Sequence, residues 1–426
     1  MGVGINSDKK LPQGAWQVVI LLFFVGALNY LDRSMITTMR GSIVDAIPMT
    51  DAQFGLLTSV FLWVYGLLSP FAGFLADKFS RRKVIIVSLC VWSAVTLLTS
   101  YATTFNELLA TRALMGISEA CYIPASLALI MDYHRGSTRS TASALNMTGI
   151  MVGSSLGFLG GWIAEHHSWN LAFSIFGVIG IFYAICLIFL LRDAPKTVDY
   201  AVEPTEGKFR LGTTLSDLFK RRSFVLMILF WGLLGVVGWI VMGWLPTYYE
   251  KHFNLSQSMA GLYATAYLYP AALVGLLLGG LLADRWTRLN PSARIMLPAL
   301  GLLIAAPAIF AAGSTPLLYI AIICFIVYSI TQRFSDANLM PILCMVVDKR
   351  YRATAYGVVN LFSTLVGGLG IYAGGVMRDA HIDLGWLYKS AAVAMVLCAG
   401  LLWLVKRNTV RTASMSKVQS PVKEIL

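Results

Sequence analysis

Twelve long apolar runs, separated by short charged or turn-rich connections, dominate this sequence. They lie near residues 15–40, 52–76, 84–103, 107–132, 139–164 and 170–192, and again near 223–250, 257–283, 292–312, 316–347, 353–377 and 386–405. A helix needs roughly 20 apolar residues to cross a bilayer, and each run is about that long or longer. Backbone polar groups cannot stay unsatisfied in hydrocarbon, so such runs form helices. We therefore expect an all-α membrane protein with twelve transmembrane helices.

The composition excludes a water-soluble protein of this length. Of the 426 residues, 57% are hydrophobic and only 13% are charged, whereas soluble domains carry roughly 25% charged residues. Little chain remains outside the twelve spans, so we expect no separate soluble domain. The first fourteen residues are polar and no cleavage pattern follows them, so we expect no removed signal segment.

The distribution of basic residues predicts how the chain is oriented. If the N-terminus is cytoplasmic, all but seven of the 33 Lys and Arg residues lie on cytoplasmic connections. Four lie on the opposite side and three within spans: Arg40, Lys251, Arg378 and Lys389, then Arg33, Arg112 and Arg333. By the positive-inside rule, both termini are predicted to be cytoplasmic, in a multi-pass protein of the cell (inner) membrane.

The two halves of the chain resemble each other. Residues 73–78 (GFLADK) match residues 280–285 (GLLADR), and Ser-Glu-Ala-x3-Pro at 118–124 parallels Ser-Asp-Ala-x3-Pro at 335–341. Glycine pairs at 160–161 and 374–375 are equivalent as well. These matches predict two parallel six-helix repeats that face a shared cavity, as in transporters that work by rocking two halves. We expect an N-terminal bundle at 1–192, a cytoplasmic linker at 193–222, a C-terminal bundle at 223–406 and a cytoplasmic tail at 407–426.

Four ionisable residues lie deep within spans of the first half. Each of Asp32, Arg33, Arg112 and Glu119 costs about 2.5–3.5 kcal/mol even on the most lenient insertion scale. A buried ion cluster that only fastens helices would explain them, but such clusters rarely improve on apolar packing. We favour the functional interpretation.

Helical periodicity predicts which of these side chains share a face. Arg112 and Glu119 are seven residues apart, and Tyr30 and Arg33 are three apart, so each pair lies on one face. Asp32 points about 100° away from Arg33, toward a neighbouring helix where Arg112 or Glu119 can meet it. An acid that exchanges its arginine partner can bind and release a proton. This pattern predicts proton-coupled symport.

Other polar residues are candidates for the lining of the cavity. Arg333 and Asp336 are three apart on the tenth span, where they form either a satisfied pair or an anion site, and the sequence favours neither. Six further side chains lie at midplane depth: Tyr65, Asn146, Trp239, Trp244, Tyr267 and Asn360. The segment from Trp244 through Pro246 to Tyr249 predicts a broken helix end that acts as an outer gate, although an interfacial aromatic anchor is the alternative.

The segment GFLADKFSRRK at residues 73–83 places an acid and a basic cluster in a short cytoplasmic turn. We expect Asp77 to lie near a helix N-terminus and Arg81 to pair with an acid, so that the turn locks the cytoplasmic side. Asp284 and Arg285 are the equivalents in the second copy. Metal-binding and catalytic motifs are absent, so we expect no enzyme, no metal and no cofactor besides the proton as coupling ion.

The same segment resembles the signature loop of the major facilitator superfamily. Within that superfamily, NYLDR at residues 29–33 and R-x3-G-x2-EA-x3-P at 112–124 resemble the anion:cation symporter family, which includes hexuronate, sugar-acid and sialic-acid carriers. Spinster-like lipid carriers share the NYxDR and GxxEA patterns. The chain departs from the usual pattern at the Arg333/Asp336 pair and at residues 132–135 (DYHR), which puts the substrate more than the mechanism in question.

This resemblance implies a role for each matched residue. Arg33 would hold a substrate carboxylate, Asp32 and Glu119 would carry protons, and Arg112 would tune them. Tyr30 and Asn146 would position the ligand.

The expected function is import of a small organic anion, such as a uronate, an aldonate or sialic acid, by alternating access. The alternative is a spinster-like exporter of lysolipids or other amphiphiles. A sensor that binds a solute without moving it is a third possibility, against which the doubled gate loop argues. We expect a monomer in the lipid bilayer, with the anionic solute and protons as partners and no nucleic acid.

Overall fold

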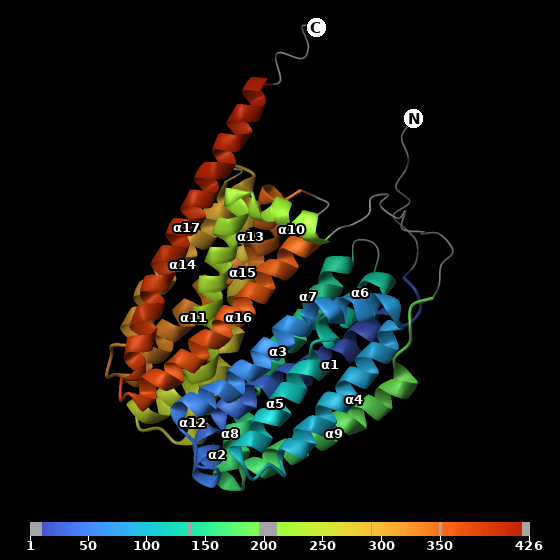
Figure 1. The fold of residues 1–426 in the computed structure, drawn as a ribbon, viewed down its shortest axis with the longest axis vertical. Coiled ribbons are helices and arrows are strands. Elements are labelled where there is room, and N and C mark those ends of the chain that lie inside the picture. Colours follow the sequence, from blue (N-terminus) through green and yellow to red (C-terminus); the bar gives the residue numbers. More distant parts are fainter. Residues whose placement is uncertain (1–10, 135–137, 196–210, 291, 349–351, 420–426) are drawn as a thin grey trace. The chain divides into compact units, whose positions relative to one another are not determined.

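The computed structural model describes residues 11–134, 138–195, 211–290, 292–348 and 352–419, and these ranges are helical without strands (Figure 1). The helices of the first half are α1 (Ala15–Thr38), α2 (Arg40–Ala46), α3 (Asp51–Lys78), α4 (Arg81–Thr99), α5 (Phe105–Glu119), α6 (Tyr122–Tyr133), α7 (Arg139–Ser155), α8 (Phe158–His166) and α9 (Trp169–Leu190). Those that follow are α10 (Leu211–Phe219), α11 (Arg222–His252), α12 (Gln257–Leu262), the π-helical turn η1 (Tyr263–Tyr267), α13 (Leu268–Thr287), α14 (Ala293–Ala312), α15 (Leu318–Val346), α16 (Arg352–Asp379) and α17 (Leu384–Gln419).

Twelve helical segments of the described chain are long and apolar enough to cross a membrane, which confirms the predicted spans. Three of these segments are interrupted: α5 with α6, α7 with α8, and α12 with η1 and α13. The first interruption has a local cause. Pro124 has no N–H to bond the carbonyl of Ala120, so the helix loosens there and α5 ends at Glu119.

Two helices lie within the predicted linker and the predicted tail. Helix α10 (Leu211–Phe219) falls within the predicted linker, and α17 continues to Gln419, beyond the predicted bundle boundary at 406. Residues 407–419 contain neither Pro nor Gly. Nothing in that sequence therefore stops the helix after the apolar run ends.

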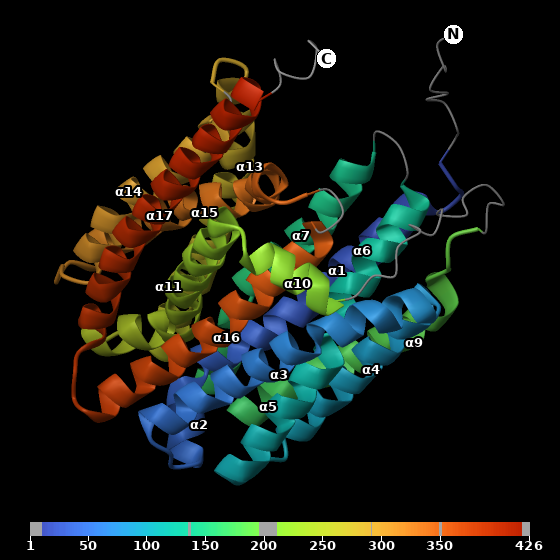
Figure 2. The ribbon, with the colours of Figure 1, turned by 45° about the horizontal axis from the view of Figure 1, so that its top comes forward.

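The chain divides into two compact units. The first comprises residues 1–49, 63–207 and 257–266, and the second comprises 50–62, 208–256 and 267–426. In the first unit α1 packs on α7 and α4 packs on α9. In the second, α11 packs on α16 and α14 packs on α17, which lie side by side in Figure 2. The same pairing of spans, first with fifth and third with sixth, thus occurs in both halves, as the internal repeat predicts.

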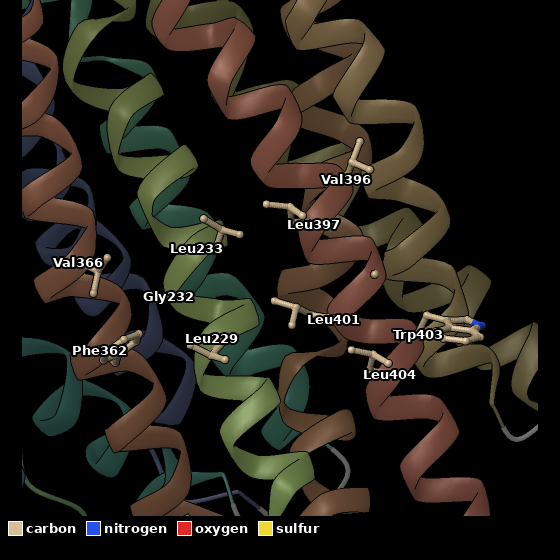
Figure 3. A pocket seen from close by; sticks show the side chains of 11 residues that line it. Leu229, Gly232, Leu233, Phe362, Val366, Val396, Leu397, Leu401, Trp403 and Leu404 are labelled. Carbon is tan, nitrogen blue, oxygen red and sulfur yellow. The ribbon is translucent and has the colours of Figure 1, made fainter.

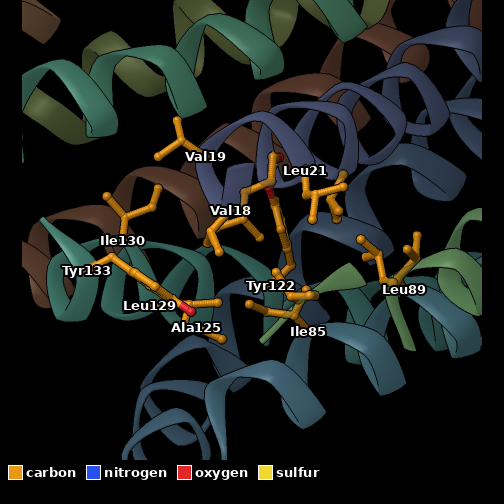
Figure 4. Close-up of a cluster of buried hydrophobic side chains, with 14 of the residues drawn as sticks. Val18, Val19, Leu21, Ile85, Leu89, Tyr122, Ala125, Leu129, Ile130 and Tyr133 are labelled. Carbon is orange, nitrogen blue, oxygen red and sulfur yellow. The ribbon is translucent and has the colours of Figure 1, made fainter. Parts of the chain in front are cut away.

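A hydrophobic core holds the first unit together. Figure 4 shows Val18 and Leu21 of α1 beside Ile85 and Leu89 of α4, with Tyr122 of α6 among them. All five side chains are buried. This core fixes α1 against α4 and α6, and α1 carries the buried charged residues Asp32 and Arg33.

The repeated glycines allow helices to pack closely in both units. A Cβ on Gly160 of α8, in the fifth span, would lie 2.6 Å from Cβ of Met35 on α1. A Cβ on Gly374 of α16 would lie 2.6 Å from the indole nitrogen of Trp244 on α11. Equivalent glycines therefore serve equivalent helix crossings, the fifth span on the first and the eleventh on the seventh.

The prediction of a broken helix end after Trp244 was wrong. Helix α11 continues through Pro246 to His252. The Trp244 side chain is fully buried, and its indole N–H donates to the carbonyl of Ile371 at 2.9 Å. Proline is tolerated within a membrane helix because neighbouring helices hold the segment in place.

We expect Gly153→Val to destabilise the first unit. The added side chain meets backbone atoms of Ala27, which cannot move without separating α7 from α1. Overpacking of this kind costs about 1–3 kcal/mol. The thermal unfolding temperature of the purified protein should fall by several degrees. Gly357→Val is the matched control because a Cβ at Gly357 meets nothing within 4 Å; an equal loss in both variants would contradict the packing argument.

Candidate functional site

The centre of the candidate site is a buried ion pair between Arg33 of α1 and Glu119 of α5. Nε of Arg33 donates to Oε2 of Glu119 at 2.6 Å, and the two side chains are only 2% and 0% exposed. The guanidinium carbon lies 4.6 Å from the ring centre of Tyr30 and 4.5 Å from that of Tyr65. Two aromatic rings and one carboxylate therefore surround the guanidinium, an arrangement that suits arginine because its planar group both stacks and hydrogen-bonds.

Local sequence explains how these four side chains meet. Tyr30 precedes Arg33 by three residues, so both lie on one face of α1. Tyr65 comes from α3, within the part of that helix that belongs to the first unit. Glu119 is the last residue of α5, just before the interruption that Pro124 explains.

Asp32 is buried beside Arg33 and faces α4. The hydroxyl of Thr96 lies 3.2 Å from Oδ2 of Asp32, to which it donates. Among the described residues no hydrogen-bond donor meets Oδ1. The carboxyl thus has one oxygen held by a neutral hydroxyl and a second oxygen without a donor, where a proton can be bound.

Arg112 of α5 completes the cluster. Its side chain is buried, Nη1 lies 3.0 Å from Sδ of Met115, and it interacts electrostatically with both Asp32 and Glu119. Helical periodicity predicts that Arg112 or Glu119 meets Asp32. The structure directs Glu119 to Arg33 and leaves Arg112 near both acids. With both acids ionised, two arginines and two carboxylates balance in charge, which limits the cost of keeping charges out of water.

The two predicted asparagines lie in different surroundings. Asn146 of α7 is fully buried, and its Oδ1 is 3.2 Å from the hydroxyl of Tyr122, which donates to the carbonyl of Leu22 at 2.7 Å. Asn360 of α16 is partly buried, and its backbone carbonyl accepts a hydrogen bond from the hydroxyl of Thr364 at 2.8 Å. Asn146 thus helps to join α7 to α6, and a ligand contact for either asparagine stays a prediction.

In the second unit, Arg333 and Asp336 form an ion pair within α15. Nη1 of Arg333 lies 2.8 Å from Oδ2 of Asp336, and the side chains are 29% and 21% exposed. Tyr328 and Tyr269 are electrostatic neighbours of Arg333. The pair is therefore less buried than Arg33 and Glu119, and its use as an anion site stays a prediction.

Ion pairs are present near both copies of the gate loop. Nε of Arg81 lies 3.6 Å from Oδ2 of Asp132, and Nη2 of Arg294 lies 2.8 Å from Oδ1 of Asp284. Arg285 is exposed, and the side chain of Asp77 lies outside the described residues. Both pairs join neighbouring helices, while their role in gating stays a prediction.

A polar junction between α3 and α16 in the second unit was not predicted from the sequence. The carboxylate of Asp379 accepts hydrogen bonds from the backbone N–H groups of Asp51 and Ala52, at 2.8 and 3.0 Å, and so caps α3. Nε of Arg378 donates to Oδ2 of Asp51 at 2.9 Å. These residues are more than 300 positions apart, and each follows or begins an apolar run, where charges are common. No local signal singled them out.

Known proteins resemble this chain along most of its length. The family model of the Major Facilitator Superfamily matches residues 22–370 and 233–425. The protein spinster homolog 1 of Xenopus laevis is 27% identical over 411 residues, which cover 90% of this chain and 77% of the relative. A protein of Cupriavidus necator described as a probable sulfoacetate transporter, SauU, is 24% identical over 415 residues, covering 90% of this chain and 92% of the relative.

The fold also matches a solved structure. A bacterial homologue of the human lysosomal transporter Spinster, in an inward-facing and unoccupied conformation, aligns with a TM-score of 0.79 at 24% identity, over 94% of this chain and 98% of the other. Twelve membrane helices, the internal repeat and a family match along nearly the whole sequence lead to one conclusion. The chain belongs to the major facilitator superfamily and is a multi-pass membrane transporter, not an enzyme.

Proposed function

We propose that this protein is a proton-coupled symporter that imports a small organic anion by alternating access. The substrate class that we propose first is acidic sugars, such as uronates, aldonates or sialic acid. The observation that supports this most is the buried pair of Arg33 and Glu119, with the guanidinium over the rings of Tyr30 and Tyr65. An arginine in this position can bind a carboxylate through two parallel hydrogen bonds once its present partner is neutralised.

The charge balance of the cluster links the proton to the anion. When Glu119 is ionised it occupies Arg33, and when it is protonated the positive charge of Arg33 becomes available to a substrate. Proton and anion then enter together, and the net charge of the cluster does not change. Keeping the site neutral in each state avoids the large cost of a lone charge in a dry region.

Asp32 is the second candidate for the coupled proton. One of its oxygens has no donor among the described residues, and Arg112 lies close enough to influence both acids. We assign Arg33, Tyr30 and Tyr65 to substrate binding and Asp32, Glu119 and Arg112 to proton coupling. We assign the ion pair of Arg81 with Asp132 and that of Asp284 with Arg294 to the gating of the cytoplasmic side. Both termini are cytoplasmic in this proposal.

A second candidate function is transport of an amphiphile such as a lysolipid. The similarity to spinster proteins favours it. The relative described as a sulfoacetate transporter favours a small organic anion instead. Both substrate classes carry an anionic group that Arg33 can bind. The two functions therefore differ in the rest of the substrate that the cavity accepts, a small polar body or an acyl chain.

Reconstitution into liposomes tests the proposal. One compound at a time is added outside: glucuronate, gluconate, sialic acid, sulfoacetate or a lysophospholipid. Only a compound that is transported should acidify the lumen. Addition of a protonophore to cells should abolish accumulation of the same substrate. Uptake that ignores the protonophore would overturn proton coupling, and lumen acidification with the lysophospholipid alone would favour the second candidate.

A further inference from the structure

An apolar groove runs along the second unit between α11, α16 and α17 (Figure 3). Its volume is about 740 Å³, within the roughly 300–1,000 Å³ of pockets that hold drug-sized ligands. Leu229 and Leu233 of α11 face Leu397 and Leu401 of α17 across it, and Val366 of α16 lies at its side. The walls offer dispersion contacts and almost no hydrogen-bonding groups, so a polar solute would lose its hydration here without compensation.

Two glycines shape this groove in different ways. A Cβ on Gly232 would lie 2.5 Å from the ring of Phe362, so the α11 wall is closed by that ring. A Cβ on Gly400 of α17 would meet nothing within 4 Å. The absence of a side chain at Gly400 therefore leaves open space on a helix whose neighbouring positions carry Leu397 and Leu401.

Positive charge lies at one end of the groove. Figure 3 shows Leu229 and Leu404 toward this end. Arg222 precedes Leu229 by seven residues and shares its helix face, about 10 Å away along α11. Arg407 follows Leu404 by three residues, and its guanidinium carbon lies 5.9 Å from the ring centre of Trp403, which also lines the groove.

We propose that this groove binds one acyl chain of an anionic phospholipid, whose phosphate lies between Arg222 and Arg407. Both arginines are exposed. An aliphatic chain matches walls that are themselves aliphatic, and basic side chains at a membrane surface attract anionic lipid headgroups. Trp403 is an aromatic residue of the kind enriched at the membrane interface. The predicted topology places this end of the helices at the cytoplasmic leaflet.

The occupant is expected to be a lipid of the bilayer because of what surrounds the groove. Acyl chains are the surrounding solvent of a membrane helix, so a chain needs no entry path. In hydrocarbon the selectivity must come from shape and from the headgroup, since transfer from water contributes nothing. The open space at Gly400 supplies the shape, and the two arginines supply the preference for an anion.

Native mass spectrometry of the purified full-length protein tests this inference. Phosphatidylglycerol and phosphatidylcholine with identical chains are added in separate titrations. We expect one phosphatidylglycerol to persist through activation that removes other lipids. Replacing Arg222 and Arg407 by Gln should lower its retention by about fivefold for each arginine, to the level of phosphatidylcholine.

Filling the groove tests the position of the chain. Gly400→Phe should remove the retained lipid, whereas Val393→Phe, at an exposed position of α17 that does not line the groove, should leave it in place. If Gly400→Phe does not give a monodisperse protein, Leu229→Phe fills the same space from the facing helix.

Three outcomes would overturn the inference. In the first, the filled variants retain the lipid as well as the unmodified protein does. In the second, both lipids are retained equally and the arginine substitutions have no effect. In the third, the protein is a dimer that Gly400→Phe dissociates. The last would show that a second copy of the chain occupies the groove.

Discussion

Arg33→Lys is expected to weaken substrate binding severely, although the charge is retained. The guanidinium of Arg33 lies over two tyrosine rings and donates to Glu119 at 2.6 Å. A lysine ammonium cannot stack over rings as a plane or bind a carboxylate through two parallel hydrogen bonds. Loss of one charge-assisted hydrogen bond costs about 1.5–3 kcal/mol. Affinity should therefore fall by roughly 10- to 100-fold, measured as substrate-dependent lumen acidification and as direct binding to the purified protein.

Two controls separate loss of binding from loss of the fold. Arg288→Lys makes the same replacement at an exposed position and should transport normally. The thermal unfolding of Arg33→Lys, followed in parallel, should show a folded protein. Near-normal affinity in Arg33→Lys would show that the anion is bound elsewhere, and Arg333→Lys would then be the next variant to measure.

The fold was predictable from the sequence because hydrocarbon imposes one requirement on every span. A run of about 20 apolar residues must form a helix to satisfy its own backbone, so the twelve spans follow from length and composition alone. The repeat was visible for a related reason. The equivalent glycines Gly160 and Gly374 pack against α1 and α11, and a side chain at either position would collide with the facing helix.

The main residues of the candidate site were predictable because charges stand out in an apolar sequence. Asp32, Arg33, Arg112 and Glu119 come together in the first unit. Thr96 was not found, since a hydroxyl in a membrane helix gives no such contrast, although it donates to Asp32. The sequence also could not predict that Glu119 pairs with Arg33. Helical periodicity gives the face of α1 that carries Arg33 but not the height along α1 at which α5 ends.

Context decided the remaining differences between expectation and structure. Pro124 coincides with an interruption between α5 and α6, whereas Pro246 lies inside the continuous helix α11. The same residue type thus has opposite outcomes, because the packing of Trp244 against α16 holds α11 in place. The contacts among Asp51, Arg378 and Asp379 depend on tertiary proximity alone, so only the structure reveals them.

Glu119→Gln is expected to separate exchange of substrate from its accumulation. A neutral amide imitates the protonated acid in shape and leaves Arg33 available to an anion, but it cannot release a proton. Liposomes preloaded with unlabelled substrate should therefore still exchange it for labelled substrate. With one proton coupled to each anion, a pH difference of one unit supports about tenfold accumulation in the unmodified protein. That accumulation should be lost in Glu119→Gln.

Asp32→Asn provides the paired measurement, because Asp32 and Glu119 lie in the same buried cluster and differ in their partners. Glu119 faces Arg33 directly, whereas Asp32 accepts from the neutral hydroxyl of Thr96. If only one variant loses accumulation while both retain exchange, that acid carries the coupled proton. Should Glu119→Gln concentrate substrate as well as the unmodified protein, Glu119 serves only to fasten α5 to α1, and the buried cluster is structural at that position. Retained exchange with lost accumulation cannot arise from a merely weakened helix contact, because a weakened contact would reduce both.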